Sequence, residues 1–347
     1  MDLQRRLNVI EYIKGGDFMA EKTSKIRDFS LDNIRFFLIF TVVFAHLLEI
    51  FRAFSGSVFI YRFIYSFHMP LFIFLFGYNV KFSPKKIIFR WFIPYLIFQS
   101  AYILFSKYAL KIDTEFQYTT PYWLLWYMLA CIFYQLILPL INTDVKRKQA
   151  LILTLSFVIA LVVGFEESIG YYLSLSRILV FMPWFLLGYY FKKNGTVDVI
   201  SSRKKLKISL LISAVVIIVL SALFLYYSKI NNGLLYGALP YSKCNGKITL
   251  RAAIFLIAFS HLTLLFIGLK GFLNKRKFLI TNIGQNTLPV FLLHGFIIKA
   301  LPVYFPDLLQ YPLITLLLSF VILLILGNKL FNKAVYYIGF SWLERFF

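Results

Sequence analysis

Hydrophobic segments of about 20 residues follow one another along most of the chain, and they constrain its fold more than any other feature. Each segment is long enough to cross the ~30 Å hydrocarbon core of a bilayer as an α-helix. None shows the sustained alternation of apolar and polar residues that a membrane β-barrel strand needs. The sequence therefore predicts an all-α, polytopic transmembrane helical bundle of about ten spans. The expected spans are residues 32–51, 58–80, 87–106, 122–141, 150–165, 170–191, 207–228, 249–269, 286–305 and 311–336.

The net charge of +22 would indicate nucleic-acid binding in a soluble protein. Only 15% of the residues are charged, however, against about 25% in an average soluble domain. The basic residues also gather in the short loops between hydrophobic segments, as retention of positive charge in the cytoplasm requires. We therefore expect the lipid bilayer, and no nucleic acid, as a partner.

The loops on the side of the N-terminus are more basic than those on the other side, which contain more acidic residues. The positive-inside rule then places both termini in the cytoplasm. This predicts a multi-pass protein of a bacterial cytoplasmic membrane. The basic residues on the N-terminal side are Lys81, Lys85, Lys86, Arg90, Lys146, Arg147, Lys148, Lys192, Lys193, Arg203, Lys204, Lys205, Lys207, Lys270, Lys275, Arg276 and Lys277.

The first 28 residues are polar and contain no predicted span, so we expect residues 1–28 to be a cytoplasmic segment and residues 29–347 to form one transmembrane domain. Residues 14–17 can be encoded by a purine-rich stretch that resembles a bacterial ribosome-binding site. Met19 is therefore a candidate for the true start of translation.

The first span contains four ionisable residues in a segment that is otherwise apolar: Asp32, Arg35, His46 and Glu49. Arg35 and His46 are eleven positions apart, so they fall about 20° apart around a helix, with a rise of roughly 16 Å between them. Asp32 lies one turn before Arg35, and Glu49 one turn beyond His46. An Arg or Asp at the centre of a lipid-facing helix costs about 2.5–3.5 kcal/mol. The other helices are therefore expected to enclose this polar face.

All four histidines, His46, His68, His261 and His294, fall within predicted spans. The imidazole suits general acid–base catalysis near neutral pH, and an ionisable residue inside a membrane indicates a functional site. This interpretation is favoured for His46, which has charged neighbours on its own helix. For His261 and His294, which have none, a structural hydrogen bond between helices is the simpler interpretation.

The second span has Pro70 two residues after His68. Proline removes a backbone donor and opens the helix, which predicts a freed carbonyl near His68. A kink without a functional role is the alternative.

Three arginines, Arg62, Arg177 and Arg251, are expected in the half of the bundle away from the N-terminus. They can extend their charged ends to the lipid headgroups, or they can face inward and hold an anionic or hydroxyl-rich substrate.

The two cysteines, Cys131 and Cys244, suggest neither a disulfide framework nor a metal site. The sequence also contains no phosphate-binding loop, nucleophile elbow or dinucleotide-binding glycine pattern.

Several of these segments resemble motifs of the membrane-bound acyltransferase-3 family. The Arg35–His46 spacing within LDNIRFFLIFTVVFAH is similar to the opening motif of that family, and FHMPLFIFLFGY (67–78) is similar to its second-span motif. The segments PYWLLWYMLAC (121–131) and LLHGFIIK (292–299) resemble its fucose 4-O-acetylase-like branch. The paired-arginine RxxR motif of some relatives is missing, because Tyr65 stands three residues after Arg62.

The resemblance implies transfer of an acetyl group from cytoplasmic acetyl-CoA, the expected co-substrate, to a sugar hydroxyl of a surface polysaccharide or its lipid-linked precursor. Arg35 would bind the phosphate-rich donor and His46 would act as general base, with an acetyl-histidine intermediate as a variant. Supporting or substrate-binding roles would fall to Asp32, Glu49, Arg62, His68 and Arg177, with no metal. The alternatives are a polysaccharide exporter or flippase, an enzyme of poly-N-acetylglucosamine succinylation or export, and a structural or sensory membrane subunit.

Overall fold

The computed structural model describes residues 29–50, 56–228, 230–269, 277–306, 312–339 and 342–343. Within these residues the secondary structure is helical and no strand is present. In the described part of the chain, nine helical segments are long and apolar enough to cross a membrane, and a tenth pass needs a bent pair of helices. The predicted all-α polytopic bundle is confirmed. The nine segments are Ser30–Ile50, Ser57–Asn79, Pro84–Ala109, Trp123–Ile141, Lys146–Phe165, Tyr172–Lys193, Lys204–Tyr227, Ile248–Leu269 and Thr287–Tyr304.

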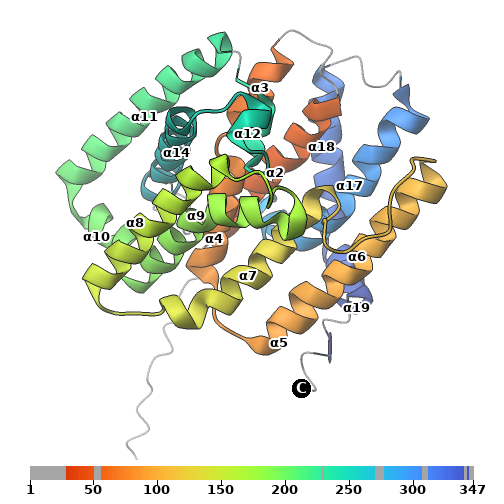
Figure 1. Ribbon diagram of the computed structural model, residues 1–347, viewed down its shortest axis with the longest axis horizontal. Coiled ribbons are helices and arrows are strands. Elements are labelled where there is room, and N and C mark those ends of the chain that lie inside the picture. The colour runs from red at the N-terminus through yellow and green to blue at the C-terminus, as the bar shows by residue number, and fades with distance from the viewer. Residues whose placement is uncertain are drawn as a thin grey trace, which may run out of the picture.

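The main helices are mostly labelled in Figure 1. They are α2 (Ser30–Ile50), α3 (Ser57–Tyr65), α4 (His68–Asn79), α5 (Pro84–Lys86), α6 (Ile93–Leu104), α7 (Trp126–Ile141), α8 (Lys146–Val162), α9 (Leu175–Lys193), α10 (Thr196–Ser202), α11 (Lys204–Tyr227), α12 (Asn232–Tyr236), α13 (Tyr241–Cys244), α14 (Ile248–Leu262), α16 (Thr281–Gln285), α17 (Thr287–Tyr304), α18 (Pro312–Leu326) and α19 (Lys329–Ile338).

Helix α2 is largely buried within the bundle, whereas α11 lies at its edge (Figure 1). The neighbours of α2 include α3, α4, α16, α17 and α18. Asp32 and His46 are only 4% and 8% exposed. The bundle thus encloses two of the polar residues of the first span, which would be costly in contact with lipid.

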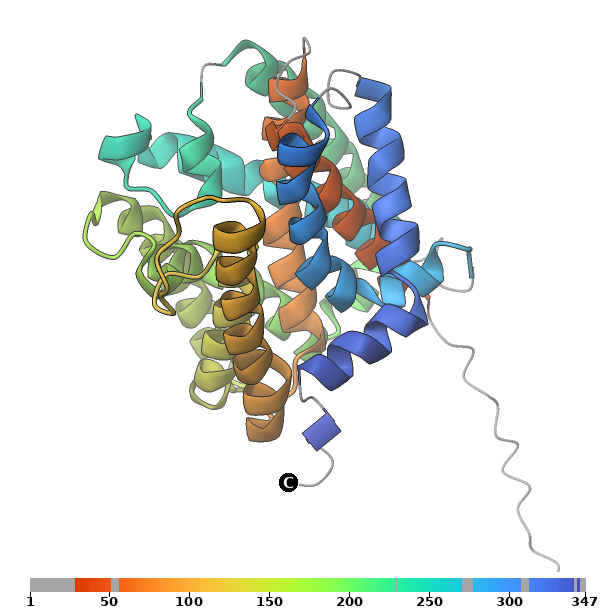
Figure 2. The same cartoon turned by 90° about the vertical axis from the view of Figure 1, so that its right-hand side faces the viewer.

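The last predicted span, 311–336, is not one straight helix. Helix α18 ends at Leu326, and α19 leaves it at an angle of 66° (Figure 2). Asn328 explains the break, because its side chain accepts hydrogen bonds from the backbone N–H groups of Leu330 and Phe331 and so caps a new helix. The predicted span 311–336 thus consists of two helices at an angle, a bend that the hydropathy of the segment does not record.

The second span is also interrupted, between α3 and α4. The break falls at Ser66 and Phe67, so that His68 becomes the first residue of α4 and Pro70 lies in its first turn. Proline is tolerated there because the first helical N–H groups have no partner within the helix. His68 thus lies beside an opened stretch of backbone.

Helices α4 and α9 pack closely through two glycines. A Cβ atom at Gly77 would collide with the carbonyl of Phe185, and one at Gly188 would collide with the carbonyl of Phe74. Small residues let helix backbones approach in this way inside membranes. The contact fixes α4, which begins at His68, against α9, which contains Arg177.

The long connection between α11 and α14 folds back onto α3 and α9. The guanidinium of Arg62 donates to Asn232 Oδ1 (3.0 Å) and to the carbonyl of Ser228 (2.8 Å), and Ser176 Oγ donates to the carbonyl of Gly237 (2.8 Å). These bonds hold α12 over one end of the bundle.

The predicted polar segment 1–28 lies outside the described residues.

Candidate active site

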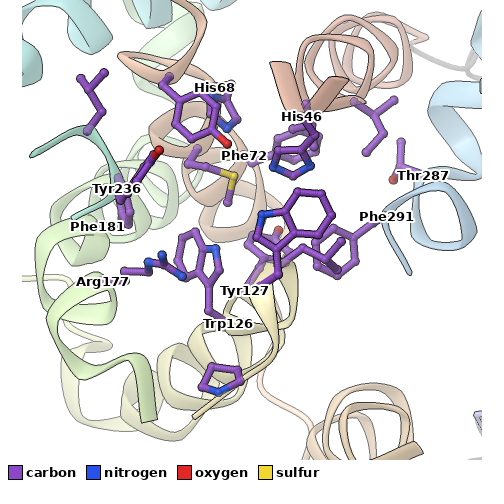
Figure 3. A pocket seen from close by; sticks show the side chains of 18 of the residues that line it. His46, His68, Phe72, Trp126, Tyr127, Arg177, Phe181, Tyr236, Thr287 and Phe291 are labelled. Carbon is purple, nitrogen blue, oxygen red and sulfur yellow. The ribbon is translucent and has the colours of Figure 1, made fainter. Parts of the chain in front are cut away.

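A cavity of about 310 Å³ lies inside the bundle, with walls from helices far apart in the sequence (Figure 3). This volume is at the lower end of the range for small-molecule sites. The lining residues include His46 and Glu49 from α2, Tyr65 and His68 from the α3–α4 break, Arg90 and Trp91, Trp123, Trp126 and Tyr127, Tyr171 and Arg177, Tyr236, and Thr287 and Phe291.

Both ends of the bundle contribute to this cavity. Arg90 and Thr287 lie near the starts of their spans, on the side where α2 begins. Glu49, next to the last residue of α2, and Tyr236 of α12 lie on the opposite side. Because the lining reaches from one end of the spans to the other, two ligands can approach the cavity from different sides.

A chain of hydrogen bonds fixes the protonation pattern of His46. Nδ1 of His294 lies 2.7 Å from the carbonyl oxygen of Val290, which can only accept, so this nitrogen carries the proton. In a neutral imidazole the other nitrogen is then an acceptor. Nε2 of His294 lies 3.0 Å from Nδ1 of His46 and accepts a hydrogen bond from the N–H at that position. Nε2 of His46 is therefore left unprotonated, which is the state that a general base requires.

Trp123 packs against His46 and restricts its ring. The two ring centroids are 4.5 Å apart, and the Nζ of Lys299 lies 4.5 Å from the same indole. Trp123 has φ of 37°, a left-handed backbone conformation that is rare for a residue with a side chain. Such strain is held in place by its surroundings and often accompanies functional sites. Here the strained residue is Trp123, whose side chain forms part of the cavity wall next to His46.

His68 adds a second imidazole to the cavity wall. Its Nδ1 lies 2.8 Å from the carbonyl oxygen of Ile64, so this nitrogen donates and Nε2 remains an acceptor. This carbonyl lies in the last turn of α3, next to the predicted break. The ring of Tyr65 packs edge-on against His68 at 4.6 Å, and its hydroxyl donates to Glu49 Oε2 at 3.4 Å. His68, Tyr65 and Glu49 thus form one polar section of the wall.

Arg35 and Asp32 lie at the N-terminal end of α2 rather than among the cavity-lining residues. They form an ion pair of 2.9 Å, and Gln285 donates to the second oxygen of Asp32 at 3.1 Å. The side chain of Arg35 is 30% exposed. Arg35 therefore lies outside the cavity lining, with its guanidinium held by Asp32, and its role toward the donor stays a prediction.

The remaining predicted residues divide into two groups. Arg177 lines the cavity beside Trp126 (Figure 3). Arg62 lies outside the lining and is bonded to the connection that holds α12. His261 donates to the carbonyl of Ile257 on its own helix at 2.9 Å and stacks on Phe67 at 4.2 Å, so it contacts its neighbour by packing and not through the expected hydrogen bond between helices.

Three residues of the site were not predicted from the sequence: His294, Arg90 and Trp123. His294 has no charged neighbour on its own helix, so its partnership with His46 is visible only in three dimensions. Arg90 was interpreted as one of many topogenic basic residues, although it lies on a π-helical turn (Ile87–Phe92), a feature common at functional sites. The segments 121–131 and 292–299, already noted for their resemblance, contain Trp123 and His294 and were the available signal.

Within the described residues, no group of three or more His, Cys, Asp or Glu side chains is arranged to hold a metal ion. Cys131 and Cys244 are both buried and unpaired.

Neither the curated proteins nor the solved structures include a significant match to this chain, so the fucose 4-O-acetylase-like branch remains a prediction. The family model of the acyltransferase domain, acyltransferase-3, matches residues 28–327. This range covers most of the chain and contains every residue of the site described above. The protein is therefore a multi-pass membrane protein of the acyltransferase-3 family.

Proposed function

We propose that this membrane acyltransferase moves an acetyl group from acetyl-CoA to a sugar hydroxyl of a cell-surface polysaccharide or of its lipid-linked precursor. The observation that carries the proposal is the chain of hydrogen bonds from His46 through His294 to the Val290 carbonyl, which leaves Nε2 of His46 as an acceptor at the cavity wall. The proposal is also supported by the family to which the chain belongs, and by a cavity whose lining residues come from both ends of the spans.

His46 acts as the general base in this reaction. The acceptor hydroxyl oxygen attacks the thioester carbonyl carbon while its proton passes to Nε2 of His46. The carbon–sulfur bond then breaks, and the thiolate takes the proton from His46 and leaves as a free thiol. His294 stabilises the imidazolium through its acceptor Nε2. General-base catalysis of this kind typically contributes 10²- to 10⁴-fold in rate.

The two substrates meet at His46 from opposite sides. On the side where α2 begins, Arg90 lines the cavity and Arg35 lies nearby on the first turns of α2, so positive charge is available for the phosphates of the donor. His46 is about 16 Å further along the helix axis than Arg35, a distance that an extended donor can bridge. Glu49, Tyr65 and Tyr236 line the other side with groups that hydrogen-bond to hydroxyls, and we assign this side to the acceptor.

The test is the chemistry of the surface polysaccharide in cells that carry His46→Ala in place of the parental protein. We expect O-acetyl signals to vanish from its NMR spectrum while polymer still reaches the surface. His261→Ala serves as control, because His261 contacts Phe67 and Ile257 outside the cavity lining, and O-acetylation should persist. Unchanged O-acetylation in a folded His46→Ala protein would exclude the base. Polymer that accumulates inside the cell with normal acetylation would favour an exporter instead.

A further inference from the structure

Arg177 is the one basic residue, lysine or arginine, that lines the acceptor side of the cavity in the described part of the chain. Its guanidinium carbon lies 5.2 Å from the ring centroid of Trp126 and 5.1 Å from that of Tyr171 (Figure 3). Arg177 is the third residue of α9, and α9 is held against α4 by the glycine contact described above. The aromatic rings and the packed helix fix the position of the guanidinium.

This guanidinium forms no ion pair with a carboxylate of the described residues, although Glu49 is near enough to interact with its charge. No carboxylate there lies within ion-pair distance of it, and its Nε is buried without a hydrogen-bond partner. A cation inside a membrane protein is normally paired, because removing it from water without compensation is costly. Contact with aromatic rings offsets only part of this cost. The arrangement fits a site that is completed by a bound anion.

The other two arginines at this end have different surroundings. Arg62 donates to Asn232 and Ser228 and lies outside the cavity lining. Arg251 is buried over the ring of Tyr241 and donates to the carbonyl of Ala160; its Nε and Nη2 are also buried without a partner, but it lies outside the lining. Arg177 alone of the three combines an unpartnered donor with access to the cavity that contains His46.

We propose that the acceptor carries an anionic group, a carboxylate or a phosphate, that binds Arg177 while its hydroxyls face Glu49 and His46. The planar guanidinium presents parallel N–H donors that match a carboxylate or a phosphate. Glu49 lies on a different helix, α2, and its carboxylate can accept hydrogen bonds from the hydroxyl groups of the same acceptor sugar. Two kinds of acceptor supply this chemistry: an acidic sugar, and a sugar joined to its carrier lipid through phosphate. This inference rests on the proposed acetyl transfer and names its acceptor class.

Three soluble probes that share one sugar ring test the inference: methyl β-D-glucoside, methyl β-D-glucuronide and glucose 1-(methyl phosphate). The purified protein in lipid nanodiscs is assayed for binding, by the shift in its melting temperature, and for transfer of labelled acetyl groups. We expect the anionic probes to bind at least about tenfold more tightly than the neutral glucoside, as a charge-assisted hydrogen bond allows. A preference for the glucuronide alone assigns the anion to the sugar ring. A preference for the phosphodiester alone assigns it to the lipid linkage.

Variants of two arginines complete the design. Arg177→Gln should abolish the preference for anionic probes, and Arg177→Lys should keep part of it. In the matched control, Arg62→Gln, the ratio between anionic and neutral probes should stay unchanged. Equal binding of charged and neutral probes by the parental protein would overturn the inference, even with efficient transfer. An Arg177-dependent preference without transfer to any probe would support the anion site and count against the proposed function.

Discussion

The reactivity of His46 depends on a neighbour 248 residues further along the chain. An imidazole free of hydrogen bonds exchanges between two tautomers, and only one of them presents Nε2 as a base. The Val290 carbonyl selects the tautomer of His294, and His294 in turn selects the tautomer of His46. In the proposed reaction the base is therefore oriented through a backbone group on α17, and His294, which lies outside the cavity lining, is a positioning residue.

His294→Ala should reduce kcat by roughly 10²- to 10⁴-fold, because the Nδ1 proton of His46 loses its acceptor and the productive tautomer is no longer selected. The KM for acetyl-CoA should change little, since His294 does not line the cavity. His294→Gln should recover part of the rate, because a side-chain carbonyl can accept the same proton. Steady-state kinetics on the purified variants measures both constants. A larger effect on KM than on kcat would contradict the positioning role.

The residues within one helix were the most predictable part of the site. Asp32 and Arg35 are three positions apart, and helix geometry alone brings their side chains together. The contact of His46 with His294, by contrast, is set by how α17 packs against α2, which no local spacing encodes. Arg62 shows the same limit: its depth in the bundle was predictable, but its bonds to the connection after α11 were not.

At the scale of helices, the positions of the spans followed from hydropathy, because crossing a bilayer demands about 20 apolar residues. The break at Ser66–Phe67 has no side-chain cap and lies just before Pro70, whereas the break at Asn328 depends on such a cap. Only the first break had a clear signal in the sequence, the proline that follows His68. Hydropathy therefore predicts where a helix crosses more reliably than whether it is straight.

Gly77→Ala should destabilise the protein by about 1–3 kcal/mol or more, because the added methyl group would meet the Phe185 carbonyl and push α4 away from α9. Since these two helices carry His68 and Arg177, acetyl transfer should fall as well. The melting temperature in detergent, measured beside activity, checks the prediction. The matched control is Gly170→Ala, whose new Cβ would have no neighbour closer than 3.9 Å. Equal melting temperatures for the two variants would show that α4 and α9 need no such close approach.

For the whole molecule, the direction of the bundle in the membrane determines which substrate reaches which end of the cavity. Arg90 and Arg177 lie at opposite ends, so only one of them can face the cytoplasm. The distribution of basic residues predicts that Arg90 does. With that orientation, the proposed function requires acetyl-CoA to enter beside Arg90 and the anionic acceptor to bind beside Arg177 on the outer side.

Single cysteines on the two sides test this orientation. Lys148 and Glu115 are both exposed, at the start of α8 and in the connection before Trp123, and neither lines the cavity. A membrane-impermeant maleimide should label Glu115→Cys in intact cells, and Lys148→Cys only after the membrane is permeabilised. The native Cys131 and Cys244 are buried and should give little background. The opposite labelling pattern would place Arg177 in the cytoplasm, and the assignments of donor and acceptor sides would then have to be exchanged.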